Sequence, residues 1–141
     1  FSSSMAGEIF ALLCNQSVLK HSVSSETYNI ASFVSEAEQA MRPDGPGLLG
    51  AFAIRAEDLL HDQPPENGLG KLSGMLIGSD VAARRTWLAE EVVILGEPEL
   101  SELYQIAIEI AGAAAQCVDS AGLTLSGLRS VHQVVVQDEA P

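Results

Sequence analysis

VVILGEPELSELY, residues 92–104, joins the pattern of a buried strand directly to that of a packed helix. Residues 92–95 form a continuous apolar run, which is typical of a strand covered on both faces of a parallel sheet. Gly96 ends the run, and apolar side chains then recur at helical spacing: Leu100, Leu103, Tyr104, Ala107, Ile108 and Ala111. The segment therefore predicts a strand, a glycine turn and a helix that packs on the sheet.

The residues on either side of this unit predict a helix-rich α/β protein. Residues 113–118 are a second strand candidate, so residues 92–118 predict one strand-helix-strand unit with a parallel crossover. Asp119 or Ser120 can cap a last helix that reaches about residue 135.

Upstream, FSSSM (1–5) is a strand candidate, and a helix begins at Gly7 with Ile9, Leu12, Leu13 and Leu19 on one face. Further helices are predicted over 26–40, 48–60 and 69–83, with loops at RPDGPG and HDQPPENG. We expect residues 1–141 to form a single domain.

Composition and charge exclude several classes of function. Of the 141 residues, 47% are hydrophobic, and 7 basic against 19 acidic residues give a formal net charge of −12. Such a charge repels phosphate backbones and anionic lipid surfaces, so we expect neither nucleic acid nor membrane as a partner. Cys14 and Cys117 lack any metal-ligand spacing and predict buried reduced thiols, which fits a cytoplasmic protein.

The turn at Gly96 is the first candidate ligand site, because open parallel sheets bind ligands at the carboxyl ends of their strands. Glu97, Glu99 and Glu102 in the helix start already satisfy its positive dipole and would repel a phosphate. A neutral group such as adenine or ribose could still lie across Gly96, since glycine permits close approach. The alternative is a tight strand-to-helix turn without a ligand, and both interpretations stay open.

A stripe of glycines marks the buried helix predicted over 69–83. Gly70, Gly74 and Gly78 recur every four residues and share one side of that helix. Each helical glycine costs about 1 kcal/mol relative to alanine, so something must approach the stripe closely. A neighbouring helix or strand is one possibility, and a ligand ring is the other.

Three motifs together resemble the C-terminal half of the 2-dehydro-3-deoxygalactonokinase family. They are MAGEIFALLCNQSVL (5–19), LSGMLIGSDVA (72–82) and VVILGEPELSELYQIAI (92–108), in this order. The resemblance implies a sugar-acid kinase of the actin-like ATPase (ribonuclease H-like) fold that uses ATP and Mg²⁺ to phosphorylate 2-dehydro-3-deoxy-D-galactonate. This chain would be the C-terminal, adenosine-side lobe, and the N-terminal lobe would be absent from it.

The resemblance also implies binding residues. On the nucleotide side these are Gly96, Glu97, Pro98, Gly74 and Gly78, and on the sugar-acid side Gly7, Glu8 and Arg55. The family pattern Met-Thr-Gly-Glu reads Met-Ala-Gly-Glu here, and Gln16 replaces a common histidine, so any hydroxyl or imidazole role at those positions is lost. Asp80 either faces the cleft between lobes or is a solvated helix carboxylate.

No catalytic residue and no metal site is assigned to this chain. His21, His61 and His132 have no ligand-type partner at helical spacing. The parts that bind phosphate and Mg²⁺ in such kinases would precede Phe1, so we expect the isolated chain to be inactive. The alternative is a non-catalytic α/β interaction module that keeps the fold. An unpaired edge of the 92–95 strand predicts a homo-oligomer. The sequence leaves the stereochemistry of the acceptor sugar acid open.

Overall fold

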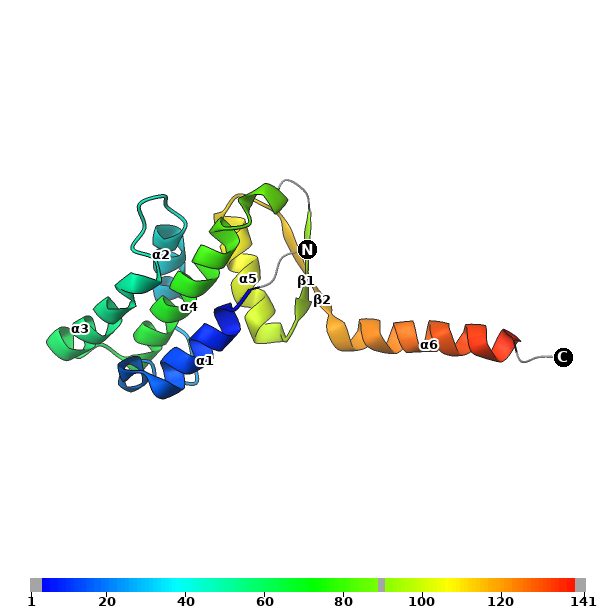
Figure 1. The fold of residues 1–141 in the computed structure, drawn as a ribbon, viewed down its shortest axis with the longest axis horizontal. Coiled ribbons are helices and arrows are strands. Elements are labelled where there is room, and N and C mark those ends of the chain that lie inside the picture. The colour runs from blue at the N-terminus through cyan, green and yellow to red at the C-terminus, as the bar shows by residue number, and fades with distance from the viewer. Residues whose placement is uncertain (1–3, 89–90, 139–141) are drawn as a thin grey trace.

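The computed structural model describes residues 4–88 and 91–138. Its helices and strands follow in the order α1 (Ala6–Gln16), α2 (Ile30–Ala40), α3 (Phe52–His61), α4 (Pro65–Ala82), β1 (Val92–Gly96), α5 (Pro98–Ile110), β2 (Ala115–Asp119) and α6 (Ser120–Asp138). Short 3-10 turns occupy Val18–His21, Leu48–Ala51 and Arg85–Trp87. Helices α1 to α5 pack into one body, the strands lie beside α5, and α6 extends away from the body (Figure 1).

The predicted helices are present, but some begin elsewhere. Helix α2 begins at Ile30 rather than at residue 26, because the Asn29 side chain accepts a hydrogen bond from the Ser32 amide and caps the helix there. Helix α4 begins at Pro65, inside the predicted loop, since proline is well suited to a first helical position. Residues 1–3 of the first strand candidate lie outside the described residues, and Ser4 and Met5 form no strand.

The glycine stripe allows α2 and α4 to pack backbone to backbone. A Cβ atom added at Gly70 would lie 2.5 Å from the Asn29 carbonyl oxygen. At Gly74 it would lie 2.4 Å from the Phe33 carbonyl oxygen, so no larger side chain fits without moving α2. Each contact advances four residues along both helices, and the two helices therefore run in the same direction.

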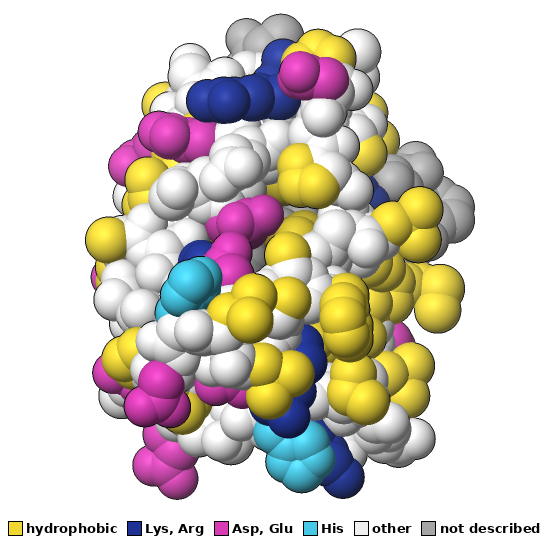
Figure 2. Space-filling view, turned by 90° about the vertical axis from the view of Figure 1, so that its left-hand side faces the viewer, with side chains coloured by type: hydrophobic (Ala, Val, Ile, Leu, Met, Phe, Trp, Pro, Cys, Tyr) yellow, Lys and Arg dark blue, Asp and Glu magenta, His cyan; other side chains and the backbone are white. Residues whose placement is uncertain are grey.

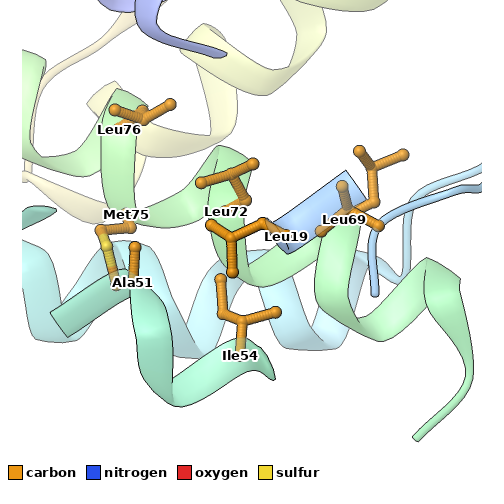
Figure 3. Packing of buried hydrophobic residues seen from close by; sticks show 8 residues of the cluster. Leu19, Ala51, Ile54, Leu69, Leu72, Met75 and Leu76 are labelled. Atoms are coloured by element: carbon orange, nitrogen blue, oxygen red, sulfur yellow. The ribbon is translucent and has the colours of Figure 1, made fainter. Parts of the chain in front are cut away.

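Helix α4 is buried because hydrophobic side chains pack on both of its sides. One cluster joins it to α1, the first 3-10 turn and α3 (Figure 3): Leu19, Val23, Ala51, Ile54, Leu69, Leu72, Met75 and Leu76. The other joins it to α2 and α5: Phe33, Ala37, Met41, Ile77, Val81, Leu103, Ala107 and Ile108. This arrangement confirms the prediction of a largely buried helix.

The two strands pair in parallel, with Ile94 opposite Cys117, which confirms the predicted crossover. Helix α5 packs on one face of the sheet through Leu103, Ala107 and Ile108. The prediction that residues 92–95 are covered on both faces is wrong for this chain, because Val93 and Leu95 are 56% and 59% exposed. An apolar run alone does not show whether the second covering layer belongs to the same chain.

Helix α6 begins at a predicted cap. The Asp119 carboxylate accepts hydrogen bonds from the amides of Ala121 and Gly122, both at 3.0 Å. Beyond this start the helix leaves the body (Figure 1), and several of its apolar side chains are exposed: Leu123, Leu125, Leu128 and Val131. In the described part of the chain, no helix is both long enough and apolar enough to cross a membrane.

Candidate functional site

The turn between β1 and α5 is accessible, as a ligand site requires. Gly96 is half-buried at the end of β1, and Glu97 and Pro98 are exposed at the start of α5. A Cβ atom on Gly96 would lie 3.1 Å from the Ser101 hydroxyl oxygen, so the glycine keeps the backbone close to its own helix. Glu97 precedes α5 and Glu99 lies in its first turn. These carboxylates complement the helix dipole, which leaves the turn suited to a neutral group rather than a phosphate.

The structure does not bring Gly74 and Gly78 to this turn. Both glycines are buried in α4, and a Cβ atom on Gly78 would lie 2.8 Å from the Ala37 carbonyl oxygen. The space beside the stripe is filled by the backbone of α2. The packing interpretation is therefore correct for the stripe, and these two glycines drop out of the nucleotide site.

A pocket of about 240 Å³ lies between the starts of α1 and α5, with α4 as its floor. It is lined by Ala6, Gly7, Phe10, Tyr28, Ser73, Leu76, Ile77, Leu100, Leu103 and Tyr104. Gly7 thus borders a cavity and has open space beside its Cα atom, while Glu8 is exposed in the same first turn of α1. The pocket combines residues from four distant segments, because Tyr28 precedes α2 while the others lie on α1, α4 and α5. In the sequence, only the strand-helix turn and the Met-Ala-Gly-Glu start pointed to this region.

The Asp80 carboxylate connects several of these segments through hydrogen bonds and an ion pair, so it is not a solvated helix carboxylate. Its carboxylate accepts hydrogen bonds from the Ser4 hydroxyl at 2.6 Å and from the Tyr104 hydroxyl at 3.0 Å. It also forms an ion pair with Arg84, which follows the end of α4. The segment before α1, the end of α4 and the middle of α5 are therefore held by one carboxylate.

The surroundings of both tyrosines that line the pocket raise the pKa of the phenol. Burial, followed by the charge and the hydrogen bond of Asp80, raises the pKa of Tyr104 to about 12, and Arg84 partly opposes the shift. Burial also raises the pKa of Tyr28, the Ser73 hydroxyl lowers it in part, and Cys14 and Glu99 raise it further. Both phenols therefore stay protonated in the folded protein at a pH where an exposed tyrosine ionises.

We expect this to be visible in an absorbance titration at 295 nm. The chain has 2 tyrosines, so the native protein should show little phenolate at pH 10, whereas the chain in denaturant should titrate near about 10. Because the fold raises both pKa values, the unfolded state loses protons first, and stability should fall as the pH rises from about 10 toward 12. A native titration that overlays the denatured one would contradict the buried positions of these rings.

Arg55 is not part of this region. It lies on α3, at the end of the body opposite β1 (Figure 1), and its guanidinium pairs with Asp58 at 2.6 Å while donating to the Ser22 hydroxyl at 3.3 Å. Figure 2 shows that end face, on which hydrophobic side chains gather among scattered charged ones. Within the described residues, no group of three or more His, Cys, Asp or Glu side chains could hold a metal ion.

Comparison with known proteins identifies the family. A family model described as 2-keto-3-deoxy-galactonokinase matches residues 1–131. A protein of Rhizobium meliloti (strain 1021) assigned as a 2-dehydro-3-deoxygalactonokinase is 27% identical over 140 residues, which are 96% of this chain and 46% of the relative. The 2-dehydro-3-deoxygalactonokinase of Escherichia coli (strain K12) is 28% identical over 138 residues, 96% of this chain and 47% of the relative.

A solved structure agrees with these sequences. The crystal structure of a protein from Sinorhizobium meliloti, assigned as a 2-dehydro-3-deoxygalactonokinase, matches with a TM-score of 0.84 at 26% identity. The match covers 96% of this chain and 46% of that structure, so the chain spans about half the length of the relatives it resembles. Because the family model matches nearly the whole chain, this protein belongs to the 2-keto-3-deoxy-galactonokinase family.

Proposed function

We propose that this chain forms the nucleotide-side half of an ATP-dependent 2-dehydro-3-deoxygalactonokinase. The observation that carries the proposal is the accessible β1–Gly96–α5 turn, which lies next to a pocket in a chain of this family. In the proposed arrangement residues 1–141 are one domain, the C-terminal lobe of an actin-like ATPase fold. The sugar acid and the phosphates of ATP would meet this lobe across a cleft from a second lobe, equivalent to the remaining length of the relatives.

The negative charges around the candidate site favour an arrangement in which the second lobe, and not this chain, binds the phosphates of ATP. Phosphoryl transfer needs positioned phosphates, Mg²⁺ and an acceptor hydroxyl in line. Glu8, Glu97 and Glu99 are all exposed around the candidate site, and they would repel the triphosphate. We therefore assign phosphate and Mg²⁺ binding to the second lobe and expect the isolated chain to lack kinase activity.

For the sugar acid, the first turn of α1 is the best candidate within this chain. Gly7 leaves open space at the helix start, and the exposed Glu8 carboxylate can accept hydrogen bonds from sugar hydroxyls. We leave Arg55 out of the substrate site, because its guanidinium is held by Asp58 and Ser22 at the other end of the body.

Replacing Gly96 in a longer protein that carries both lobes tests the nucleotide-side role. We expect Gly96→Val to raise the KM for ATP at least about tenfold with little change in the KM for 2-dehydro-3-deoxy-D-galactonate, because a branched side chain would occupy adenosine's space. The measurement is a coupled ADP-release assay with each substrate varied in turn.

Two further variants make this test specific. Gly127→Val changes a glycine on α6 that has nothing within 4 Å of an added Cβ, and it should leave both KM values unchanged. Because Ser101 is the group that an added Cβ on Gly96 would meet, Ser101→Ala should relieve strain in Gly96→Val without restoring the KM for ATP. Equal increases in both KM values would argue against a nucleotide-side role, and no ATP-dependent phosphorylation by the unsubstituted protein would overturn the kinase proposal.

A non-catalytic interaction module remains a second candidate on one observation. The β1 face with Val93 and Leu95, together with the apolar side chains of α6, is exposed, as expected of a surface that another chain or lobe covers. This candidate predicts binding of a protein partner without ADP release in any longer form of the protein.

A further inference from the structure

Asp80 lies where the helix dipole disfavours a carboxylate. It is in the last turn of α4, which ends at Ala82, and the C-terminal end of a helix carries partial negative charge. The Asp80 side chain is 16% exposed, so water offsets little of this cost. Three donors compensate the charge instead: the Arg84 guanidinium and the hydroxyls of Ser4 and Tyr104. A carboxylate at a locally unfavourable position indicates that its contacts to other segments matter.

The two oxygens of this carboxylate contact different segments. Oδ1 accepts a hydrogen bond from the Ser4 hydroxyl at 2.6 Å and pairs with Arg84. Oδ2 accepts a hydrogen bond from the Tyr104 hydroxyl at 3.0 Å. Ser4 precedes α1, and Tyr104 lies on α5, the helix that follows the Gly96 turn. Asp80 therefore joins the start of α1 to the helix of the proposed nucleotide side.

The Ser4 hydroxyl connects Asp80 to the first turn of α1. It donates its single hydrogen to Asp80 and accepts a hydrogen bond from the Ala6 amide at 3.1 Å. The N-cap residue of α1 contributes no side-chain cap. None of the residues of α1, all of which the structure describes, is buried, and Gly7 and Glu8 are exposed. The position of this turn therefore depends on its hydrogen bonds as well as on packing.

We propose that Asp80 is a positioning residue for the sugar acid: through Ser4 it holds the first turn of α1, with Gly7 and Glu8, in the place where the substrate binds. This inference rests on the proposed function, which assigns the sugar acid to that turn. Asp80 acts through Ser4 and touches neither substrate. Its bond to Tyr104 fixes the turn relative to α5, so the sugar-acid side and the nucleotide side keep a constant separation.

Ser4→Ala in a longer protein that carries both lobes tests the inference. We expect it to raise the KM for 2-dehydro-3-deoxy-D-galactonate about three- to tenfold, the range for loss of one hydrogen bond, and to leave the KM for ATP unchanged. The melting temperature should stay the same, because Ser4 is exposed. Ser4→Thr keeps the hydroxyl and should retain the unsubstituted KM. Ser79→Ala, which changes the serine beside Asp80 on α4, should leave both KM values unchanged.

A double variant shows whether Asp80 acts through Ser4. Asp80→Asn should raise the KM for the sugar acid at least as much as Ser4→Ala does, since the amide lacks the charge that the donors meet. Ser4→Ala combined with Asp80→Asn should raise it no more than Asp80→Asn alone, because both changes remove the same bond. Additive increases, or an increase for Ser4→Ala that Ser4→Thr shares, would overturn the inference even for an active kinase.

Hydrogen exchange in the 141-residue chain separates this inference from the kinase proposal. Mass spectrometry should show residues 6–9 exchanging about three- to tenfold faster in Ser4→Ala than in the unsubstituted chain or in Ser4→Thr, because the Ala6 amide loses its acceptor. Faster exchange supports the positioning role whether or not a longer protein releases ADP. Unchanged exchange overturns that role, and the kinase proposal then still depends on ADP release alone.

Discussion

Gly74→Leu should lower the melting temperature by roughly 10 °C, the shift expected when overpacking costs about 3 kcal/mol in a chain of this size. A Cβ atom at this position would lie 2.4 Å from the Phe33 carbonyl oxygen and 3.0 Å from the Ala37 amide nitrogen. Both are backbone atoms of α2, which cannot yield as the end of a flexible side chain can. The larger residue must therefore push α2 away from α4 and open the core around Phe33, which is fully buried. Thermal unfolding followed by circular dichroism measures the effect.

The control is the same substitution where space is open. Gly127 lies on the exposed helix α6, and nothing lies within 4 Å of an added Cβ there. Gly127→Leu should therefore leave the melting temperature unchanged or slightly higher, since leucine favours helix more than glycine does. A Gly74→Leu protein with normal stability but weakened ATP binding would contradict the packing role of the stripe.

The second large effect concerns association. We expect the 141-residue chain to self-associate in solution at micromolar concentrations, because Val93 and Leu95 are more than half exposed on a strand that pairs on one side only in the described structure. Such an edge offers free backbone donors and acceptors beside apolar side chains. Val93→Lys combined with Leu95→Lys should shift the mass measured by light scattering to that of a monomer, since charged side chains oppose pairing at a sheet edge.

A matched control changes an apolar residue that is at least as exposed elsewhere. Leu49 is 98% exposed in the 3-10 turn before α3, and Leu49→Lys should leave the association unchanged. An unsubstituted chain that scatters as a clean monomer across micromolar concentrations would show that this strand edge is covered, and the association prediction would then be wrong.

Local pattern was sufficient for the elements that recur at regular spacing. The apolar run before Gly96 and the helical spacing from Leu100 to Ile108 predicted β1, α5 and the parallel crossover to β2, because a short apolar run that ends at a glycine and a period of 3.6 residues are both local features of the sequence. The spacing of Gly70, Gly74 and Gly78 likewise predicted that something approaches α4. The spacing could not show whether a ligand ring or a helix backbone approaches α4, since both require the same absence of side chains.

Contacts between distant segments could not be predicted from the sequence. The pairing of Asp80 with Ser4 and Tyr104, and the cavity that Gly7 shares with Ser73, arise from residues far apart in the chain. Each of these residues has an ordinary local context, and only the packing of α1 and α5 on α4 brings them together. Arg55 shows the converse, because its local resemblance suggested a substrate role and its position places it with Asp58 at the opposite end.

ADP release tests the central claim most directly. A longer protein, in which these 141 residues follow a segment equivalent to the remaining length of the relatives, is compared with the 141-residue chain alone in a coupled assay with ATP, Mg²⁺ and 2-dehydro-3-deoxy-D-galactonate. The account predicts ADP release that depends on the sugar acid for the longer protein and none for the shorter chain, since phosphates and metal need the second lobe. Turnover by the shorter chain alone, or none by the longer protein, would contradict it.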